Sequence, residues 1–300
     1  MVSLFDKIEF AYLCLLYCRN PVEVMLNTIK KGKGVKIKFR LKNGEVFLDR
    51  LRGYWLLKLI NYGWSIALND GKILKLCKTL PTHGQRVCIK VRKEEGADLG
   101  HLIEIFEHRS YGDNFSGTVI DVGASNGDSA IYFALNGASR VIALEPYIPS
   151  YRLALENISM NALSHKIILL NVALSARSGT KELVVFNEHS DMNTTDYERS
   201  YAKKINLNNF SKIEVRAITL RDLIDEFKIE TIDFLKMDCE GCEHEIFEEI
   251  DPSILSTVKR LTIEYHSGLG VIPSILRRNN FEFKIIGGST LGYIYAFRKE

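Results

Sequence analysis

The chain has 300 residues, of which 46% are hydrophobic and 26% charged, the composition of an ordinary globular protein. Its 40 basic and 37 acidic residues give a net charge of +3, which argues against nucleic acid as the main partner but leaves a local basic patch open. The six cysteines are too few and too scattered for a disulfide framework, so we expect them to be reduced in a cytoplasmic protein.

The first 30 residues are expected to be helical, because apolar residues recur at helical spacing from Leu4 to Leu15. The Asn20–Pro21 pair interrupts this pattern. The apolar run Phe10–Cys18 is too short to cross a bilayer, and no small-residue cleavage site follows it. We therefore expect neither a membrane span nor a signal peptide.

From residue 34 to 92 the hydrophobic period changes to two, which indicates strands. The expected strands are Val35–Phe39, Val46–Leu48 and Val87–Val91. Asn43-Gly44 and Asn69–Gly71 are typical hairpin turns. Residues 1–105 are therefore predicted to be a helical arm followed by a small region of mainly antiparallel strands.

After residue 118, short apolar strands alternate with helical stretches, the pattern of βαβ units and a parallel sheet. The expected strands are Thr118–Val122, Arg140–Leu144, Ile167–Leu170, Thr231–Met237, Leu261–Tyr265, Phe281–Ile286 and Tyr293–Arg298. The last two form a hairpin that adds an antiparallel strand to the sheet. The predicted fold class is α/β, a doubly wound Rossmann-like sheet over residues 106–300 with an antiparallel C-terminal hairpin strand.

A glycine-bearing loop follows the first of these strands, where ligands bind in open α/β sheets. Gly123 and Gly127 have the spacing G-x-x-x-G and not the G-x-G-x-x-G that seats a pyrophosphate, which argues against NAD. Glu145 ends the second strand 22 positions after Gly123, a suitable place to accept hydrogen bonds from both hydroxyls of a ribose. A tight strand-to-helix turn is the alternative, but the pair favours a nucleoside without pyrophosphate.

These residues resemble the FkbM-type S-adenosylmethionine-dependent methyltransferases. The matching pieces, in the family's order, are Val119–Gly127, Glu145-Pro146, Thr219–Leu223, Ile232–Glu243 and Ile263–His266. The most specific of them is Leu235–Glu243, which matches L-K-x-D-x-E-G-x-E without a gap. Ser125 and Arg221 depart from the family's preferences. The resemblance covers about residues 106–298.

The resemblance implies S-adenosylmethionine as cofactor and assigns the residues that hold it. Asp121 and the loop after it would bind the cofactor. Gly123, Asn126 and Gly127 would cradle its methionine part, and Glu145 would hold the ribose. Asn171 and Ala173 would lie beside the adenine. Asp238 would face the sulfonium or the acceptor.

Transfer of a methyl group to an alcohol benefits from a general base, and His266 is the first candidate. An unperturbed imidazole titrates near pH 6.5 and is mostly unprotonated at neutrality, so activity is expected to rise with pH through that range. Strand alternation brings His266 to the same face as Glu264. The alternative is a histidine satisfied by a loop backbone.

Asp238 and Glu240 are the further catalytic candidates. They are expected to orient the acceptor, to bind a metal with His266, or to cap the helix that begins near Glu243. Cys239 and Cys242 have zinc-ligand spacing, but the sequence has no second C-x-x-C to complete such a site. We therefore assign no metal.

The predicted function is O-methylation of a small-molecule hydroxyl, with a sugar, a lipid precursor or another metabolite as acceptor. The polar stretch Asn187–Ser211 is the first place to look for acceptor selection. The alternatives are an RNA methyltransferase and a non-catalytic cofactor-binding protein. The sequence does not determine the acceptor or the oligomeric state.

Overall fold

The computed structural model describes residues 4–30, 35–81, 84–94, 96–186 and 188–299. The chain divides into two compact units, Met1–Ser110 and Tyr111–Glu300, whereas the sequence analysis places the boundary after residue 105. Residues 1–3 of the expected helical arm, residue 34 of the strand region and Asn187 of the polar stretch lie outside the described residues.

The N-terminal unit combines short helices with two small antiparallel sheets. Its helices are α1 (Leu4–Tyr17), α2 (Pro21–Lys30), α3 (Arg50–Asn61) and α4 (Asp98–Leu102), and its strands are β1 (Ile37–Leu41), β2 (Gly44–Leu48), β3 (Ser65–Asp70), β4 (Ile73–Thr79) and β5 (Arg86–Arg92). α1 ends at Tyr17 and α2 begins at Pro21, which confirms the predicted interruption at Asn20–Pro21. Proline is well suited to the first turn of a helix.

Both predicted hairpins are present in this unit. β1 pairs with β2, and β3, β4 and β5 form a three-stranded sheet. The first turn consists of Lys42 and Asn43, since Gly44 already pairs with Leu41. The strand pattern predicted for residues 34–92 does not include α3, which the structure shows in that range. The helix begins after Asp49, whose side chain accepts hydrogen bonds from two backbone amides.

The C-terminal unit is built on a seven-stranded sheet, with β9–β11 in a separate small sheet. Its strands are β6 (Thr118–Val122), β7 (Arg140–Leu144), β8 (Ile167–Leu170), β9 (Ala173–Leu174), β10 (Gly179–Val185), β11 (Ser211–Ile218), β12 (Ile232–Met237), β13 (Val258–His266), β14 (Phe281–Gly287) and β15 (Leu291–Arg298). Its main helices are α5 (Asp128–Leu135), α6 (Ile148–Met160), α7 (Tyr201–Lys204), α8 (Leu220–Phe227), α9 (Cys242–Glu249), α10 (Pro252–Leu255) and α11 (Ile272–Arg278).

The strand order in the large sheet is β14-β15-β13-β12-β6-β7-β8, so the predicted α/β methyltransferase sheet is confirmed. Strands β8, β7, β6, β12 and β13 are parallel, and β15 pairs antiparallel with β13. β6, β7 and β8 begin and end at the residues that the sequence predicts. β13 is longer than predicted because it pairs with β12 from Val258 onward and with β15 as far as His266.

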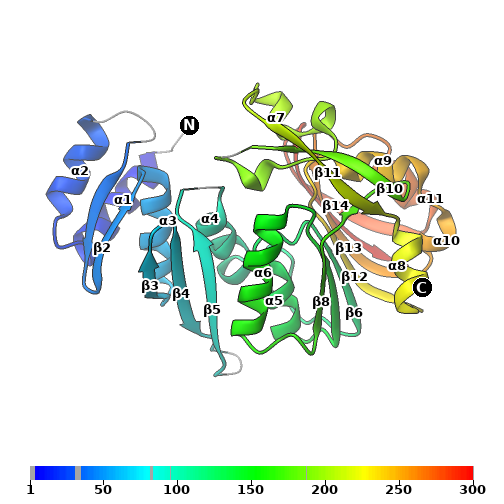
Figure 1. Cartoon of the computed structure of the whole chain (residues 1–300), viewed down its shortest axis with the longest axis horizontal. Helices are drawn as coiled ribbons and strands as arrows, with labels where there is room; N and C mark the ends of the chain where they lie inside the picture. The colour runs from blue at the N-terminus through cyan, green and yellow to red at the C-terminus, as the bar shows by residue number, and fades with distance from the viewer. Residues whose placement is uncertain (1–3, 31–34, 82–83, 95, 187, 300) are drawn as a thin grey trace. The chain divides into compact units, whose positions relative to one another are not determined.

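Alternation along the strands divides the core into two layers. Ile120, Leu235 and Ile263 belong to one apolar cluster, which also takes in buried residues of α8, α9, α10 and α11. Phe234 faces the other way and packs against Phe133 of α5, with ring centroids 5.5 Å apart. Figure 1 shows α5 and α6 on one side of the strands and α8 to α11 on the other, which is the doubly wound arrangement.

The structure contradicts the expectation that all six cysteines are reduced. The structure pairs Cys77 with Cys88 and Cys239 with Cys242 as disulfides. Cys77 and Cys88 are direct cross-strand neighbours on β4 and β5. This proximity depends on strand register, which the spacing along the sequence does not reveal. Cys14 and Cys18 are free and buried.

No helix among the described residues has both the length and the apolar content required to span a bilayer.

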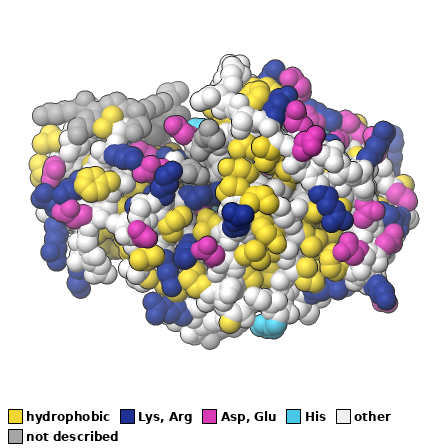
Figure 2. Space-filling model, in the orientation of Figure 1, with side chains coloured by type: hydrophobic (Ala, Val, Ile, Leu, Met, Phe, Trp, Pro, Cys, Tyr) yellow, Lys and Arg dark blue, Asp and Glu magenta, His cyan; other side chains and the backbone are white. Residues whose placement is uncertain are grey.

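The formal charge is divided unevenly between the two units. Residues 1–110 contain 20 basic and 11 acidic side chains, a net charge of +9, whereas residues 111–300 contain 20 basic and 26 acidic ones, a net charge of −6. Figure 2 shows one face of each unit, with Lys and Arg prominent on the first and Asp and Glu more frequent on the second. The small net charge of the whole chain therefore conceals a strongly basic N-terminal unit.

Candidate active site

The candidate site lies at the carboxyl ends of β6, β7 and β12. β7 and β12 flank β6 on opposite sides, so the strand order reverses there and a crevice is expected outside the strand ends. Three pieces of chain follow these ends directly: the loop Gly123–Gly127 after β6, Glu145 after β7, and Asp238 after β12. The sheet therefore brings together residues from three separate motifs.

The loop after β6 requires glycine at two positions. Gly123 has φ +78°, and a Cβ built on it would lie 1.8 Å from the backbone oxygen of Asp238. Gly127 has φ +83° and directly precedes α5, with its hypothetical Cβ 3.1 Å from that of Ala154. A side chain at Gly123 would therefore separate the β6 loop from the end of β12.

Glu145 is oriented by the backbone on both sides of the crevice. One carboxylate oxygen accepts a hydrogen bond from the amide of Ser125, and the other accepts one from the amide of Tyr147, both at 2.8 Å. The residue is 8% exposed. Because a carboxylate oxygen accepts more than one hydrogen bond, these contacts orient Glu145 without excluding a ribose.

Asn126 and Asn171 support the loops around the crevice. The Asn126 side-chain oxygen accepts a hydrogen bond from the amide of Asp128 at 3.2 Å, and its buried Nδ2 has no hydrogen-bond partner among the described residues. The Asn171 amide donates to the backbone oxygens of Glu145 and Pro146, each at 2.9 Å. Asn171 therefore fixes the turn that follows β7.

A buried lysine lies beneath the glycine loop. Lys236 of β12 is 2% exposed, and its Nζ donates to the backbone oxygens of Gly123 at 2.7 Å and Val122 at 3.2 Å. The same nitrogen lies 3.2 Å from Asp121 Oδ1 and 3.6 Å from Asp238 Oδ2. Burial alone would lower the pKa of Lys236, but the two carboxylates outweigh burial and raise the pKa above its ordinary value.

The end of β13 contributes a histidine held between two carboxylates. His266 is 1% exposed, with Nδ1 at 3.1 Å from Glu243 Oε1 and Nε2 at 3.4 Å from Glu240 Oε1. Its backbone amide also donates to Glu243 Oε1, and its backbone oxygen lies 2.5 Å from His244 Nε2. These contacts join the end of β13 to the beginning of α9.

The charges of this group shift the pKa values of its members. Burial alone would lower the pKa of His266, but Glu240 and Glu243 outweigh burial and raise the pKa well above its ordinary value. Burial raises the pKa of Glu240, against the opposing effect of His266. The assumption of an unperturbed imidazole therefore does not hold for His266, because a carboxylate lies against each of its two ring nitrogens.

The polar segment 188–210 covers the turn that follows β12. The Thr194 hydroxyl donates to the backbone oxygen of Glu240 at 2.6 Å, and a Cβ on Gly241 would lie 3.0 Å from the backbone oxygen of Asp196. The Ser267 hydroxyl donates to the backbone oxygen of Ser200 at 3.3 Å. This excursion between β10 and β11 therefore covers the catalytic candidates.

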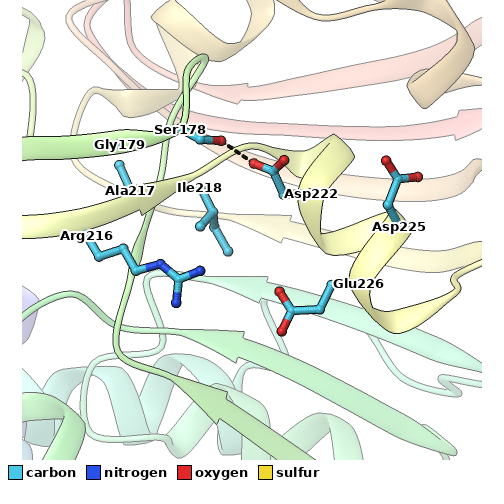
Figure 3. A pocket seen from close by; sticks show the side chains of 8 residues that line it. All are labelled: Ser178, Gly179, Arg216, Ala217, Ile218, Asp222, Asp225 and Glu226. Carbon is cyan, nitrogen blue, oxygen red and sulfur yellow. Dashed lines mark hydrogen bonds between the residues drawn. The ribbon is translucent and has the colours of Figure 1, made fainter.

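A separate pocket lies between the β10–β11 strands and α8 (Figure 3). It is lined by Ser178, Gly179, Arg216, Ala217, Ile218, Asp222, Asp225 and Glu226. Asp222 is engaged in the capping box of α8 with Thr219 and bonds to Ser178. None of the candidate site residues lines this pocket, so we do not assign the chemistry to it.

A profile of the Methyltransferase FkbM domain matches residues 121–283, which is more than half of the chain. The chain belongs to the FkbM methyltransferase family. The matched region begins at Asp121 of β6 and includes the glycine loop, Glu145, the end of β12 and the end of β13.

Several known proteins are similar to this FkbM-family chain. Methyltransferase sdnD of Sordaria araneosa is 23% identical over 179 residues, which cover 52% of this chain and 69% of that protein. The crystal structure of methyltransferase FkbM from Methylobacillus flagellatus KT is 16% identical with a TM-score of 0.44, covering 64% of this chain and 46% of that one. An rRNA methylase from Streptococcus thermophilus is 11% identical with a TM-score of 0.37, covering 62% and 89%. The chain thus spans less than half the length of the matched FkbM structure.

The FkbM-family fold brings most of the predicted residues together, with two qualifications. Asp121 is fully buried beneath the loop, where it contacts Lys236 and the Ser129 hydroxyl. Ala173 lies in β9 and pairs with Ala217. The cofactor contacts assigned to these two residues stay predictions, as do those of the others.

Helix capping does not explain Glu240, which contacts His266 through its carboxylate. The residue before α9 is Gly241, and its amide donates to Glu243 Oε2 at 2.9 Å. Sequence reasoning missed the roles of Lys236 and Glu243, although both belong to the most specific motif. A charged residue inside an apolar strand, as at Lys236, is the signal that could have indicated a buried ion pair.

We predict that Lys236→Met lowers the free energy of unfolding by about 3 to 5 kcal/mol, because it leaves the buried carboxylate of Asp121 without its cation. Urea denaturation measures the change. The control is Lys259→Met, since Lys259 is 64% exposed in its pair with Asp233 and should contribute less than about 1 kcal/mol. Equal effects of the two substitutions would contradict the role given to Lys236.

Proposed function

We propose that this methyltransferase takes its methyl group from S-adenosylmethionine and transfers it to a small-molecule hydroxyl. The observation that carries the proposal is the meeting of the Gly123–Gly127 loop, Glu145 and Asp238 at one point of strand reversal. The carboxylate of Glu145 suits ribose hydroxyls, and no pyrophosphate-binding glycine pattern accompanies it.

Features of the loop fit the proposed cofactor. Close approach of the backbone is possible because Gly123 and Gly127 lack side chains. The buried Nδ2 of Asn126 has no hydrogen-bond partner among the described residues, which leaves a donor available where the amino-acid part of the cofactor would lie. Asn171 and Ala173 would border the adenine.

The cofactor supplies a methyl group on a positively charged sulfur, so that displacement by an acceptor oxygen needs alignment and a dry site. Lys236 fixes the distance between the β6 loop and Asp238 through its bonds to the backbone of the loop. Asp238, whose side chain is 27% exposed, would orient the acceptor. The cover formed by residues 188–210 would limit access of water and of large acceptors.

Glu240 replaces His266 as the proposed proton acceptor. The imidazole of His266 is engaged on both nitrogens, whereas Glu240 Oε2 is buried with no hydrogen-bond partner among the described residues. The acceptor hydroxyl would lose its proton to Glu240 as its oxygen takes the methyl group that the cofactor would supply, and the sulfur would leave as the neutral thioether. His266 then acts as a positioning residue that holds Glu240 against α9.

We expect S-adenosylhomocysteine to bind the protein and NAD not to bind. Glu145→Ala should weaken S-adenosylhomocysteine binding by about 1.5 to 3 kcal/mol, the usual contribution of hydrogen bonds to a charged group. Isothermal titration calorimetry measures both. Glu230→Ala, a change at an exposed position before β12, is the control and should bind as the parent does. Unchanged affinity in Glu145→Ala would remove Glu145 from the site.

We predict that Glu240→Gln lowers the rate of methyl transfer by about 10² or more, since a general base contributes roughly that factor. Affinity for S-adenosylhomocysteine should stay within about twofold of the parent, because the change is made on the acceptor side. Transfer of labelled methyl from S-adenosylmethionine to a fractionated metabolite extract provides the assay. Normal turnover in Glu240→Gln would return the role of base to His266 or Asp238.

The second candidate function is methylation of RNA, and the +9 charge of residues 1–110 favours it. A surface that neutralises phosphates gives binding that falls steeply with salt, with a logarithmic slope of about −0.7 per contacted phosphate for single strands. We expect no saturable binding of a labelled RNA at about 150 mM salt in fluorescence anisotropy. Tight binding with a steep salt dependence would favour the RNA substrate instead.

A further inference from the structure

The carboxyl end of β13 contains a second arrangement of charged groups, beside the cofactor loop. Met237 pairs with Ile263 across β12 and β13, so the residues that follow them, Asp238 and Glu264, are neighbours in the sheet. One oxygen from each of these carboxylates and one ring nitrogen of His266 lie within 4.8 Å of one another. The three side chains thus converge on a common point.

We propose that Asp238, Glu264 and His266 bind a divalent transition-metal cation, for which Mn²⁺ is the probe. Carboxylate oxygens suit Mg²⁺, Ca²⁺ and Mn²⁺, whereas an imidazole favours transition metals, so the mixed set selects Mn²⁺ over Mg²⁺ and Ca²⁺. Opposite ligands of an ion bound at about 2.1 Å are about 4.2 Å apart. Small side-chain rotations bring the three atoms to that separation.

The surroundings of His266 are those of a metal ligand. Metal-bound histidines almost always donate their second ring N–H to a carboxylate or a carbonyl. His266 Nδ1 lies 3.1 Å from Glu243 Oε1, and Glu243 is fully buried. That contact fixes the ring, and Nε2 would exchange its contact with Glu240 Oε1, 3.4 Å away, for the cation. The orientation of the His266 ring thus depends on Glu243, a side chain to which the proposed methyl transfer gives no other role.

A second, independent observation comes from Glu240. Its Oε2 is buried with no hydrogen-bond partner among the described residues, and its Oε1 lies 3.4 Å from His266 Nε2. A buried carboxylate oxygen without a donor is costly, and a cation bound at Nε2 would relieve that cost. Glu240 would therefore adjoin the cation through His266 Nε2 without being one of its three ligands.

The local charge balance agrees with a dication. Asp238, Glu240, Glu243 and Glu264 are acidic, and members of this group contact Lys236, His244 and His266. Cys239 and Cys242 do not join the ligand set, because their sulfurs are bonded to each other. A bound cation would polarise the acceptor hydroxyl beside Asp238 and ease the loss of its proton to Glu240. This catalytic consequence rests on the proposed function, whereas the cation site itself does not.

The test measures Mn²⁺ binding to the full chain without cofactor, by electron paramagnetic resonance of the free ion and by calorimetry. We expect about one Mn²⁺ per chain, with weaker binding of Mg²⁺ and Ca²⁺. Glu264→Gln and Asp238→Asn should each weaken Mn²⁺ binding by about tenfold or more. Circular dichroism shows that each variant is folded.

The control is Glu282→Gln, an exposed strand carboxylate of β14 paired with Lys299, which should bind Mn²⁺ as the parent does. Absence of binding up to millimolar Mn²⁺, or unchanged binding in both site variants, overturns the proposal. An equal loss in Glu282→Gln would also overturn it, since binding would then be non-specific. Mn²⁺ binding in a protein that fails to bind S-adenosylhomocysteine would preserve this site and reject the proposed function.

Discussion

The ammonium group of Lys236 holds the candidate active site together. It is buried beneath the glycine loop, donates to the backbone of that loop, and lies beside the carboxylates of Asp121 and Asp238. Without this cation, two carboxylates would face each other near the ends of β6 and β12. The close approach of Gly123 to the backbone of Asp238 then fixes the crevice between the two strands.

Carboxylates hold together the other part of the site, at the end of β13 and the beginning of α9. Glu243 holds the imidazole and the backbone amide of His266, so that the end of β13 and the first turn of α9 move as one piece. Glu240 faces the opposite side of the ring with φ +57°, a conformation that ordinary side chains rarely adopt. Its position is therefore maintained by its surroundings and not by local preference.

The two units of the chain have different physical characters. The C-terminal unit contains the family match and carries an excess of acidic residues, whereas the N-terminal unit is basic. Many of the exposed large hydrophobic residues lie on α1 and α2, including Ile8, Leu15 and Ile29. Both properties distinguish this unit from the C-terminal unit. Its basic charge is the reason to test RNA as well as small molecules as acceptors.

The sequence by itself determined the strands β6, β7 and β8 to the residue, the glycine loop and Glu145, because hydrophobic period and turn chemistry are local properties. It did not determine the contacts of Lys236 with Asp121, Val122 and Gly123, which lie more than a hundred residues away in the chain, nor the carboxylates around His266. The pairing of Cys77 with Cys88 likewise followed from the tertiary structure. Charge and covalent partners depend on which strands become neighbours, and only the folded sheet decides that.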